Sequence, residues 1–107
     1  MKMNFSQNDK GSMKVIFEPE QTVLSEFLEG DVQGAVPYCR EILDETLSVK
    51  MGDKSKWSIN GNAYSLTVTK ENVLLEGRWE KIKLELPIND FMQAVSGWLA
   101  FLESPRR

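Results

Sequence analysis

The carboxylates between Glu18 and Glu45 are the residues of this 107-residue chain whose types and spacing most clearly suggest a function. This segment carries a charge of −7, with Arg40 as its one base, while the whole chain carries −3. An acidic surface attracts a basic partner and speeds encounter with it. We therefore predict that a basic protein partner is bound by the eight acids of the segment: Glu18, Glu20, Glu26, Glu29, Asp31, Glu41, Asp44 and Glu45. The alternative is a solvated acidic face that only keeps the protein soluble.

The chain contains no histidine, which removes the most common catalytic and metal-binding side chain. Without imidazole there is no Ser-His or Cys-His nucleophile pair and no zinc site of the usual Cys/His kind. The acids do not follow the spacing of a calcium-binding loop. We predict a protein that is not an enzyme, with no catalytic residues, no metal and no cofactor. A small enzyme that uses two carboxylates is kept as a further alternative, and it requires a deep pocket lined by both.

Trp79 is the aromatic residue that we expect to be exposed, because it follows Gly77 and Arg78 at a break in the strand pattern. Tryptophan and arginine are enriched at the energetic centres of protein interfaces, so Trp79 joins the predicted partner-binding residues. Cys39 lies on an apolar helical stripe and is predicted to be a buried structural thiol.

Nucleic acid and membranes are not expected partners. The net charge is negative, and the basic residues near Trp79 are offset by the neighbouring acids Glu76, Glu80 and Glu85. The longest apolar runs fall far short of the ~20 residues that cross a bilayer, and the N-terminus lacks a signal-peptide pattern. With a single cysteine, which fits a reducing compartment, these features predict a cytoplasmic protein.

The central element that positions these residues is a predicted hairpin over Trp57 to Lys70, in which Asn60-Gly61 forms a two-residue type I′ loop. That loop places Ile59 opposite Asn62 and Trp57 opposite Tyr64. Alternation then collects the apolar side chains on one face of the ribbon. This face consists of Trp57, Ile59, Tyr64, Leu66 and Val68.

The remaining elements follow from periodicity and from turn residues. Thr22 to Leu28 is predicted to be a strand, with a short helix as the competing alternative. A helix begins near Val36 or is kinked at Pro37, and it ends between Lys50 and Gly52. A first hairpin is predicted over Met3 to Ser6 and Met13 to Phe17, and two further strands over Val73 to Glu76 and Lys81 to Leu86. The last helix is capped by Asn89 or Asp90, and its inner stripe is Phe91, Val95, Trp98 and Leu102. Ser104 to Arg107 are predicted to be a frayed end.

These elements predict an α+β fold in which two helices pack on one face of an antiparallel sheet of about five to six strands, built from a hairpin and a meander. Residues 1–107 form a single domain, although Met1, Met3 and Met13 are alternative start positions and leave open whether residues 1–12 are native. The edge strand Ile82 to Leu86 could pair with a second copy of the chain, so a homodimer stays an alternative.

Residues in three of these elements resemble those of the YacL family of small bacterial proteins. They are Phe5, Asp9, Gly11, Lys14 and Val15 in the first hairpin, Trp57, Gly61, Tyr64 and Leu66 in the central one, and Asp90, Phe91 and Phe101 in the last helix. The connection between Val73 and Leu84 is shorter than in that family. The resemblance implies a fold and a cytosolic bacterial setting, and it supplies no catalytic motif.

In size, acidity and build the chain also looks like the immunity proteins that accompany bacterial toxins, including those of contact-dependent inhibition systems. An acidic protein of this size can block the basic cleft of a nuclease. The leading hypothesis is therefore a non-enzymatic immunity protein that neutralises a basic toxin. The alternative is a YacL-like cytosolic housekeeping protein with a structural or regulatory role.

Overall fold

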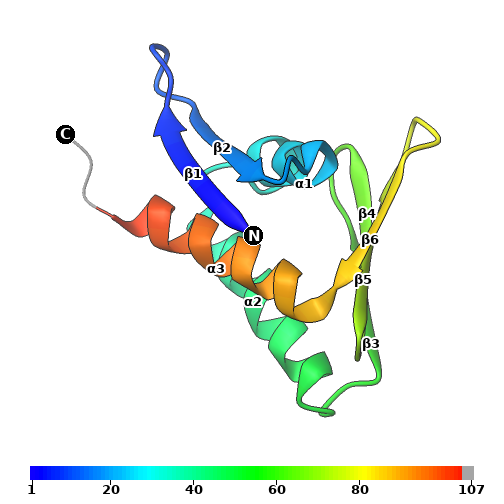
Figure 1. The fold of residues 1–107 in the computed structure, drawn as a ribbon. Coiled ribbons are helices and arrows are strands. Elements are labelled where there is room, and N and C mark those ends of the chain that lie inside the picture. The colour runs from blue at the N-terminus through cyan, green and yellow to red at the C-terminus, as the bar shows by residue number, and fades with distance from the viewer. Residues whose placement is uncertain (105–107) are drawn as a thin grey trace.

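The computed structural model describes residues 1–104 and has the predicted α+β class (Figure 1). Its six strands are all antiparallel to their neighbours, and they are divided between two sheets rather than joined in one. The two-stranded sheet is the first hairpin, β1 (Lys2–Gln7) and β2 (Met13–Glu18). The four-stranded sheet is a meander of β3 (Lys56–Asn60), β4 (Tyr64–Thr69), β5 (Asn72–Gly77) and β6 (Lys83–Pro87).

Helices cover one face of the meander and separate it from the hairpin (Figure 1). α2 (Val36–Lys50) packs against β3 and β4, and α3 (Ile88–Glu103) packs against β5 and β6. On the inner face of the sheet Leu66, Val68 and Leu75 are fully buried. The predicted apolar face of the central ribbon is therefore confirmed. Burying these side chains supplies the main favourable free energy of folding.

The strand predicted over Thr22 to Leu28 is wrong, and the competing helix is correct. The segment forms α1 (Thr22–Glu26), which continues into the π-helical turn η1 (Phe27–Val32). Leu24, Phe27 and Leu28 are spaced three and four residues apart, and all three are fully buried. A strand would place Leu24 and Leu28 on one face and Phe27 on the other, whereas a helix places all three on one side.

The two-residue loop predicted at Asn60-Gly61 is also wrong. Ile59 pairs with Leu66 and Trp57 pairs with Val68, so the register differs by four residues from the predicted one. Gly61 does not adopt the positive φ of a type I′ turn. An even shift preserves which side chains share a face, which explains why the face was predicted correctly although the pairing was not.

The two long helices agree with prediction in position and differ in detail. α2 begins at Val36 with Pro37 in its first turn, where proline is tolerated. Its buried stripe is Cys39, Ile42, Thr46 and Val49, whereas the apolar Leu47 is exposed. The predicted inner stripe of α3 is buried, but no side chain caps its N-terminus. Asn89 and Asp90 lie inside the first turn, because the helix begins earlier, at the buried Ile88.

The C-terminal end is described only as far as Ser104, whose hydroxyl donates a hydrogen bond to the carbonyl oxygen of Phe101. The rest of the frayed end predicted for Ser104 to Arg107 lies outside the described residues.

Candidate functional site

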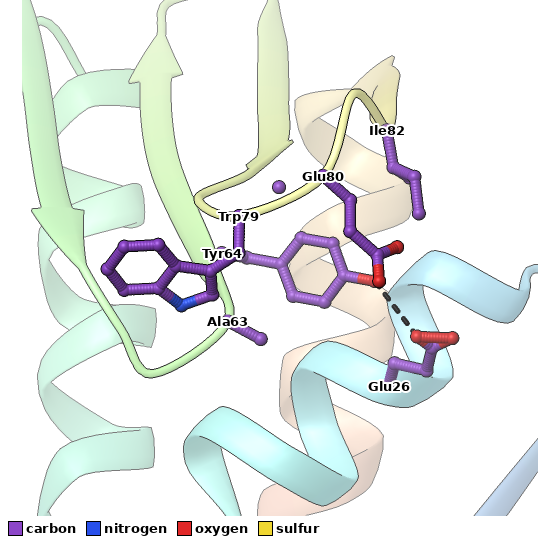
Figure 2. A pocket seen from close by; sticks show the side chains of 7 residues that line it. Glu26, Ala63, Tyr64, Trp79, Glu80 and Ile82 are labelled. Atoms are coloured by element: carbon purple, nitrogen blue, oxygen red, sulfur yellow. Dashed lines mark hydrogen bonds between the residues drawn. The ribbon is translucent and has the colours of Figure 1, made fainter.

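Two connections of the meander meet at one end of the sheet and form the most distinctive surface of the molecule (Figure 2). They are residues 61–63 between β3 and β4, and residues 78–82 between β5 and β6. The two lie side by side because Tyr64 pairs with Gly77 across the sheet. We call these connections, together with Glu26 of α1 and Tyr64 at the start of β4, the loop end.

Asp31 of η1 fixes the first connection by accepting two backbone hydrogen bonds. Its Oδ1 accepts the backbone N–H of Ala63 at 2.9 Å, and its Oδ2 accepts that of Tyr64 at 3.0 Å. A Cβ atom on residue 61 would lie 2.5 Å from that Oδ2, so the close approach of Asp31 requires glycine there. This contact, made across 30 positions of sequence, explains why the connection is wider than a two-residue turn.

Backbone hydrogen bonds fix the path of the second connection. Gly77 donates its N–H to the carbonyl oxygen of Ile82 at 2.7 Å, and Arg78 donates its N–H to the carbonyl oxygen of Ala63 at 2.9 Å. A Cβ atom on Gly77 would lie 2.6 Å from the carbonyl oxygen of Glu80. The bend predicted at Gly77 therefore depends on the absence of a side chain.

Trp79 is exposed as predicted, with 75% of its surface accessible, yet it is fixed in place. Its indole N–H donates to the carbonyl oxygen of Asn62 at 3.1 Å. The guanidinium carbon of Arg78 lies 4.8 Å from the centre of the indole ring, and Arg78 also donates to the carbonyl oxygen of Gly61 at 2.5 Å. A large aromatic side chain that is already ordered loses little entropy when a partner covers it.

Next to Trp79 is a pocket of about 120 Å³, whose lining comes from α1, from both connections and from the adjoining ends of β4 and β5 (Figure 2). The hydroxyl of Tyr64 donates a hydrogen bond to Oε2 of Glu26 at 3.0 Å. The ring of Tyr64 is buried. The residues that line the pocket are Glu26, Ala63, Tyr64, Gly77, Trp79, Glu80 and Ile82.

The pKa of Tyr64 is raised to about 12, chiefly by burial, then by its hydrogen bond to Glu26 and by the negative charges of Glu26, Glu80 and Asp31. The shift favours the neutral phenol in the folded protein. Tyr64 therefore stabilises the fold at pH values below its unfolded pKa near 10, and this contribution is lost as the pH rises from about 10 to about 12.

We expect an absorbance titration of tyrosinate in the folded protein to show a transition near pH 12 that a Tyr64→Phe variant lacks. Tyr38, the only other tyrosine, also has a raised pKa, first because of burial. A Tyr38→Phe variant should keep the transition near pH 12. If Tyr64 in this variant titrates at an ordinary value near 10, its phenol is neither buried nor hydrogen-bonded to Glu26 in solution.

The eight predicted partner-binding acids are spread over β2, the segment after it, α1, η1 and α2. Asp31 is buried, and Glu26 lines the pocket. The other six lie elsewhere: Glu18 accepts from Asn4, Glu20 accepts from Thr22, Glu29 binds β2, Glu45 pairs with Lys54 at 2.6 Å, and Glu41 and Asp44 are exposed on α2. The loop end thus includes Trp79 and one of the eight acids, Glu26, while Asp31 binds the backbone of its first connection.

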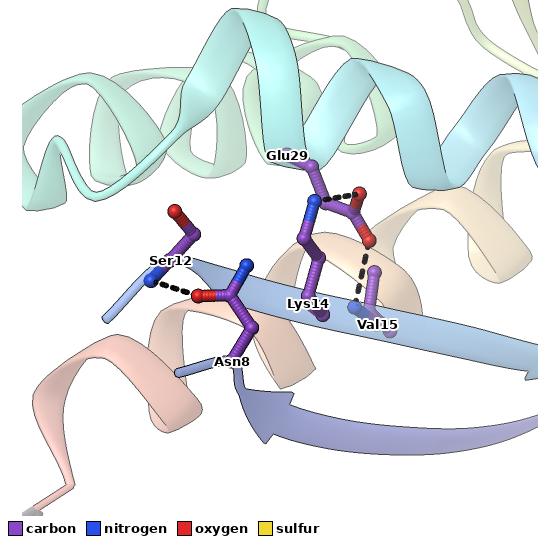
Figure 3. Close-up of polar contacts among 5 residues, drawn as sticks. All are labelled: Asn8, Ser12, Lys14, Val15 and Glu29. Atoms are coloured by element: carbon purple, nitrogen blue, oxygen red, sulfur yellow. Dashed lines mark hydrogen bonds and ion pairs between the residues drawn. The ribbon is translucent and has the colours of Figure 1, made fainter. Parts of the chain in front are cut away.

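Glu29 binds the outer edge of the first hairpin (Figure 3). Its carboxylate accepts the backbone N–H of Val15 at 2.9 Å and pairs with the ammonium group of Lys14 at 3.4 Å. At the tip of the hairpin, Oδ1 of Asn8 accepts the backbone N–H groups of Lys10 and Ser12. These contacts connect η1 to β2 and fix the shape of the hairpin.

The sequence did not predict three residues of the loop end. The alternation of the central hairpin predicts only that Tyr64 is apolar core, and the sequence around Glu80 indicates only a charge that offsets nearby bases. Ile82 was placed in a strand, whereas it lies in the connection. The sequence contains one indication that Glu80 belongs to this surface, because Glu80 directly follows Trp79.

Cys39 is buried, as predicted, and its Sγ lies 3.7 Å from the carbonyl oxygen of Val95. Burial, with a smaller effect of Glu103 opposed by Arg40, raises its pKa to about 11, so the thiol is protonated at neutral pH. Within residues 1–104, no group of three or more His, Cys, Asp or Glu side chains is arranged to hold a metal ion. The helices of this part of the chain are too short or too polar to cross a membrane.

Comparison with known proteins gives one match. Residues 1–86, from β1 to β6, match the model of an uncharacterised protein family, UPF0231. No curated protein and no solved structure is significantly similar to the chain. Since the match covers most of the length, the chain belongs to the uncharacterised protein family UPF0231.

Proposed function

We propose that the protein is a non-enzymatic binding module that contacts a basic protein partner through its loop end. The observation that carries this proposal is Trp79, which is 75% exposed although its indole N–H and its ring are both engaged by neighbouring residues. Fixed tryptophans flanked by arginine have the composition of interface hot spots. The carboxylates of Glu26 and Glu80 beside it favour a partner of positive charge.

The size of the adjacent pocket argues against a small-molecule substrate at the loop end. It measures about 120 Å³. Sites for small molecules usually enclose roughly 300–1,000 Å³. The pair of carboxylates that line it, Glu26 and Glu80, therefore have little room for a substrate between them.

Two versions of this function differ in the partner. In one, the protein is a YacL-like housekeeping protein whose partner is a component of the same cell, and membership of an uncharacterised family fits this version. In the other, it is an immunity protein whose partner is a basic toxin of the nuclease type. Both versions use the same surface, so one experiment tests both.

The experiment is photo-cross-linking in cells that express the full chain. Lys81 is exposed and lies two residues from Trp79, and it is replaced by the photoreactive amino acid p-benzoylphenylalanine. We expect one discrete cross-linked product, which disappears when Trp79→Ala is added, because the indole is the proposed anchor. Mass spectrometry of the product then distinguishes a toxin from a housekeeping protein.

Met51 provides the matched control, because it is 70% exposed and lies at the opposite end of the sheet, before β3 begins. The photoreactive group at position 51 should give no such product, and Met51→Ala should leave the product of position 81 unchanged. Equal products from both positions, no product from position 81, or a product that survives Trp79→Ala would each overturn the proposal. A dimer of this chain as the product would replace the basic partner with a second copy.

A further inference from the structure

We propose that the pocket beside Trp79 receives a single lysine or arginine side chain of the partner. This inference rests on the proposed function and adds the chemistry that the pocket recognises. It follows from the size of the pocket, from the kinds of surface that line it and from the charges that face it.

The pocket suits the end of one long side chain. Its volume of about 120 Å³ is several times the ~30 Å³ that a water molecule occupies in the liquid. Its walls include the ring of Tyr64 and the side chain of Ile82, which can cover an alkyl stem (Figure 2). Lysine and arginine both carry such a stem beneath a charged group.

The charged groups of the pocket select a cation. In Figure 2 the side chains of Glu26 and Glu80 both extend toward the hydroxyl of Tyr64, which donates to Glu26. Neither carboxylate forms an ion pair with a lysine or arginine among residues 1–104. Lys14, which lines an adjoining hollow with Glu26, is paired with Glu29 instead.

Trp79 also lines the pocket, but its indole extends away from Glu26 and Glu80 (Figure 2), and the guanidinium carbon of Arg78 lies 4.8 Å from the ring centre. Arg78 already supplies the cation that is attracted by the face of this ring, so the preference of the pocket for a positive charge depends on the two carboxylates. Two carboxylates without an ion-pair partner repel an anion, and a neutral side chain brings no opposite charge to pair with them. The combination therefore discriminates by charge as well as by shape.

The test is a nuclear magnetic resonance titration of the full chain with three capped tripeptides, in which glycine flanks arginine, lysine or citrulline. Citrulline has the shape of arginine without its charge. With the arginine or lysine peptide at millimolar concentrations, we expect saturable shifts of the indole N–H signal of Trp79 and of the amide signals of Tyr64 and Gly77. The citrulline peptide should leave these signals in place, and the stronger of the two cationic peptides identifies the preferred side chain.

A Glu26→Gln/Glu80→Gln variant should weaken the response to the cationic peptides by about tenfold, because charge-assisted hydrogen bonds are lost. The control Glu41→Gln/Asp44→Asn removes the same charge from exposed positions of α2 and should keep the response. Three outcomes overturn the proposal: no saturable shift with either cationic peptide, equal shifts with citrulline, or equal weakening in both double variants.

The two proposals fail in different ways. If Trp79→Ala abolishes the cross-link from position 81 while Glu26→Gln/Glu80→Gln leaves it intact, the loop end binds a partner but the pocket takes no cation from it. If Trp79→Ala leaves the cross-link intact, the proposed function fails, and the tripeptide titration alone decides whether the pocket binds a cation.

Discussion

An Asp31→Ala variant should have a free energy of unfolding about 3 kcal/mol lower than that of the unchanged protein, because a hydrogen bond to a charged group contributes roughly 1.5–3 kcal/mol. Asp31 accepts two such bonds, from Ala63 and Tyr64, and it is only 8% exposed. Its removal leaves the N–H of Tyr64 without a partner next to the core. Urea denaturation followed by circular dichroism measures the loss.

Asp44 gives the matched control, since Asp44→Ala removes the same charge from an exposed position of α2. That change should alter the stability by less than about 0.5 kcal/mol. Hydrogen exchange adds a local readout, because the amides of Ala63 and Tyr64 should exchange faster only in Asp31→Ala. Equal stability of the two variants would show that Asp31 does not hold the loop end.

Gly61 allows an independent check of the same contact. A Gly61→Ala change alone forces the new Cβ against Oδ2 and Cγ of Asp31, at 2.5 Å and 2.9 Å. Alanine at position 31 removes both atoms, so the costs of the two changes should sum to more than the cost of the double variant. Additive costs would place Asp31 away from Gly61 in solution.

A Trp98→Ala variant should lose about 4 kcal/mol, within the range of 3–5 kcal/mol that truncation of a buried aromatic residue causes. Trp98 is fully buried in α3, and its ring centre lies 6.3 Å from that of Phe5 in β1 and 5.9 Å from that of Phe101. Its indole N–H donates to the carbonyl oxygen of Gln33 at 2.9 Å. Gln33 has a φ of 55°, which residues with side chains rarely adopt, so this hydrogen bond also fixes a strained turn.

Trp79→Ala is the control of identical chemistry at an exposed position. It should cost less than about 1 kcal/mol, because little apolar surface is uncovered and one surface hydrogen bond is lost. Thermal unfolding followed by circular dichroism compares the two variants without relying on tryptophan fluorescence. If Trp98→Ala is no less stable than Trp79→Ala, then Trp98 does not join the hairpin to α3.

The sequence predicted features that depend on local periodicity. The alternation from Trp57 to Val68 identified the buried face of the meander, and the spacing of Phe91, Val95 and Trp98 identified the buried stripe of α3. The exposure of Trp79 followed from the break at Gly77. These features require only the repeat of a strand or helix and the conformational preferences of single residues.

Features that depend on contacts between distant residues were not predictable in the same way. Asn60-Gly61 is a strong turn signal, but the contact with the carboxylate of Asp31 determines the register. The residues next to Gly61 in sequence give no indication of this contact. The strands divide between two sheets because β1 packs on α3 and β2 packs on α1. Tertiary contacts, and not the local sequence, determine this division. The pocket combines Glu26, Tyr64 and Glu80 from three separate segments, so its geometry exists only in the folded chain.

The bond between Glu29 and the backbone of Val15 has a consequence for how the protein behaves at high concentration. The outer side of β2 is a strand edge, and an open edge invites further strands to add to it. The carboxylate of Glu29 occupies one of the backbone donors that an added strand would need. A single side chain from η1 thus hinders the addition of a further strand at the β2 edge of the two-stranded sheet.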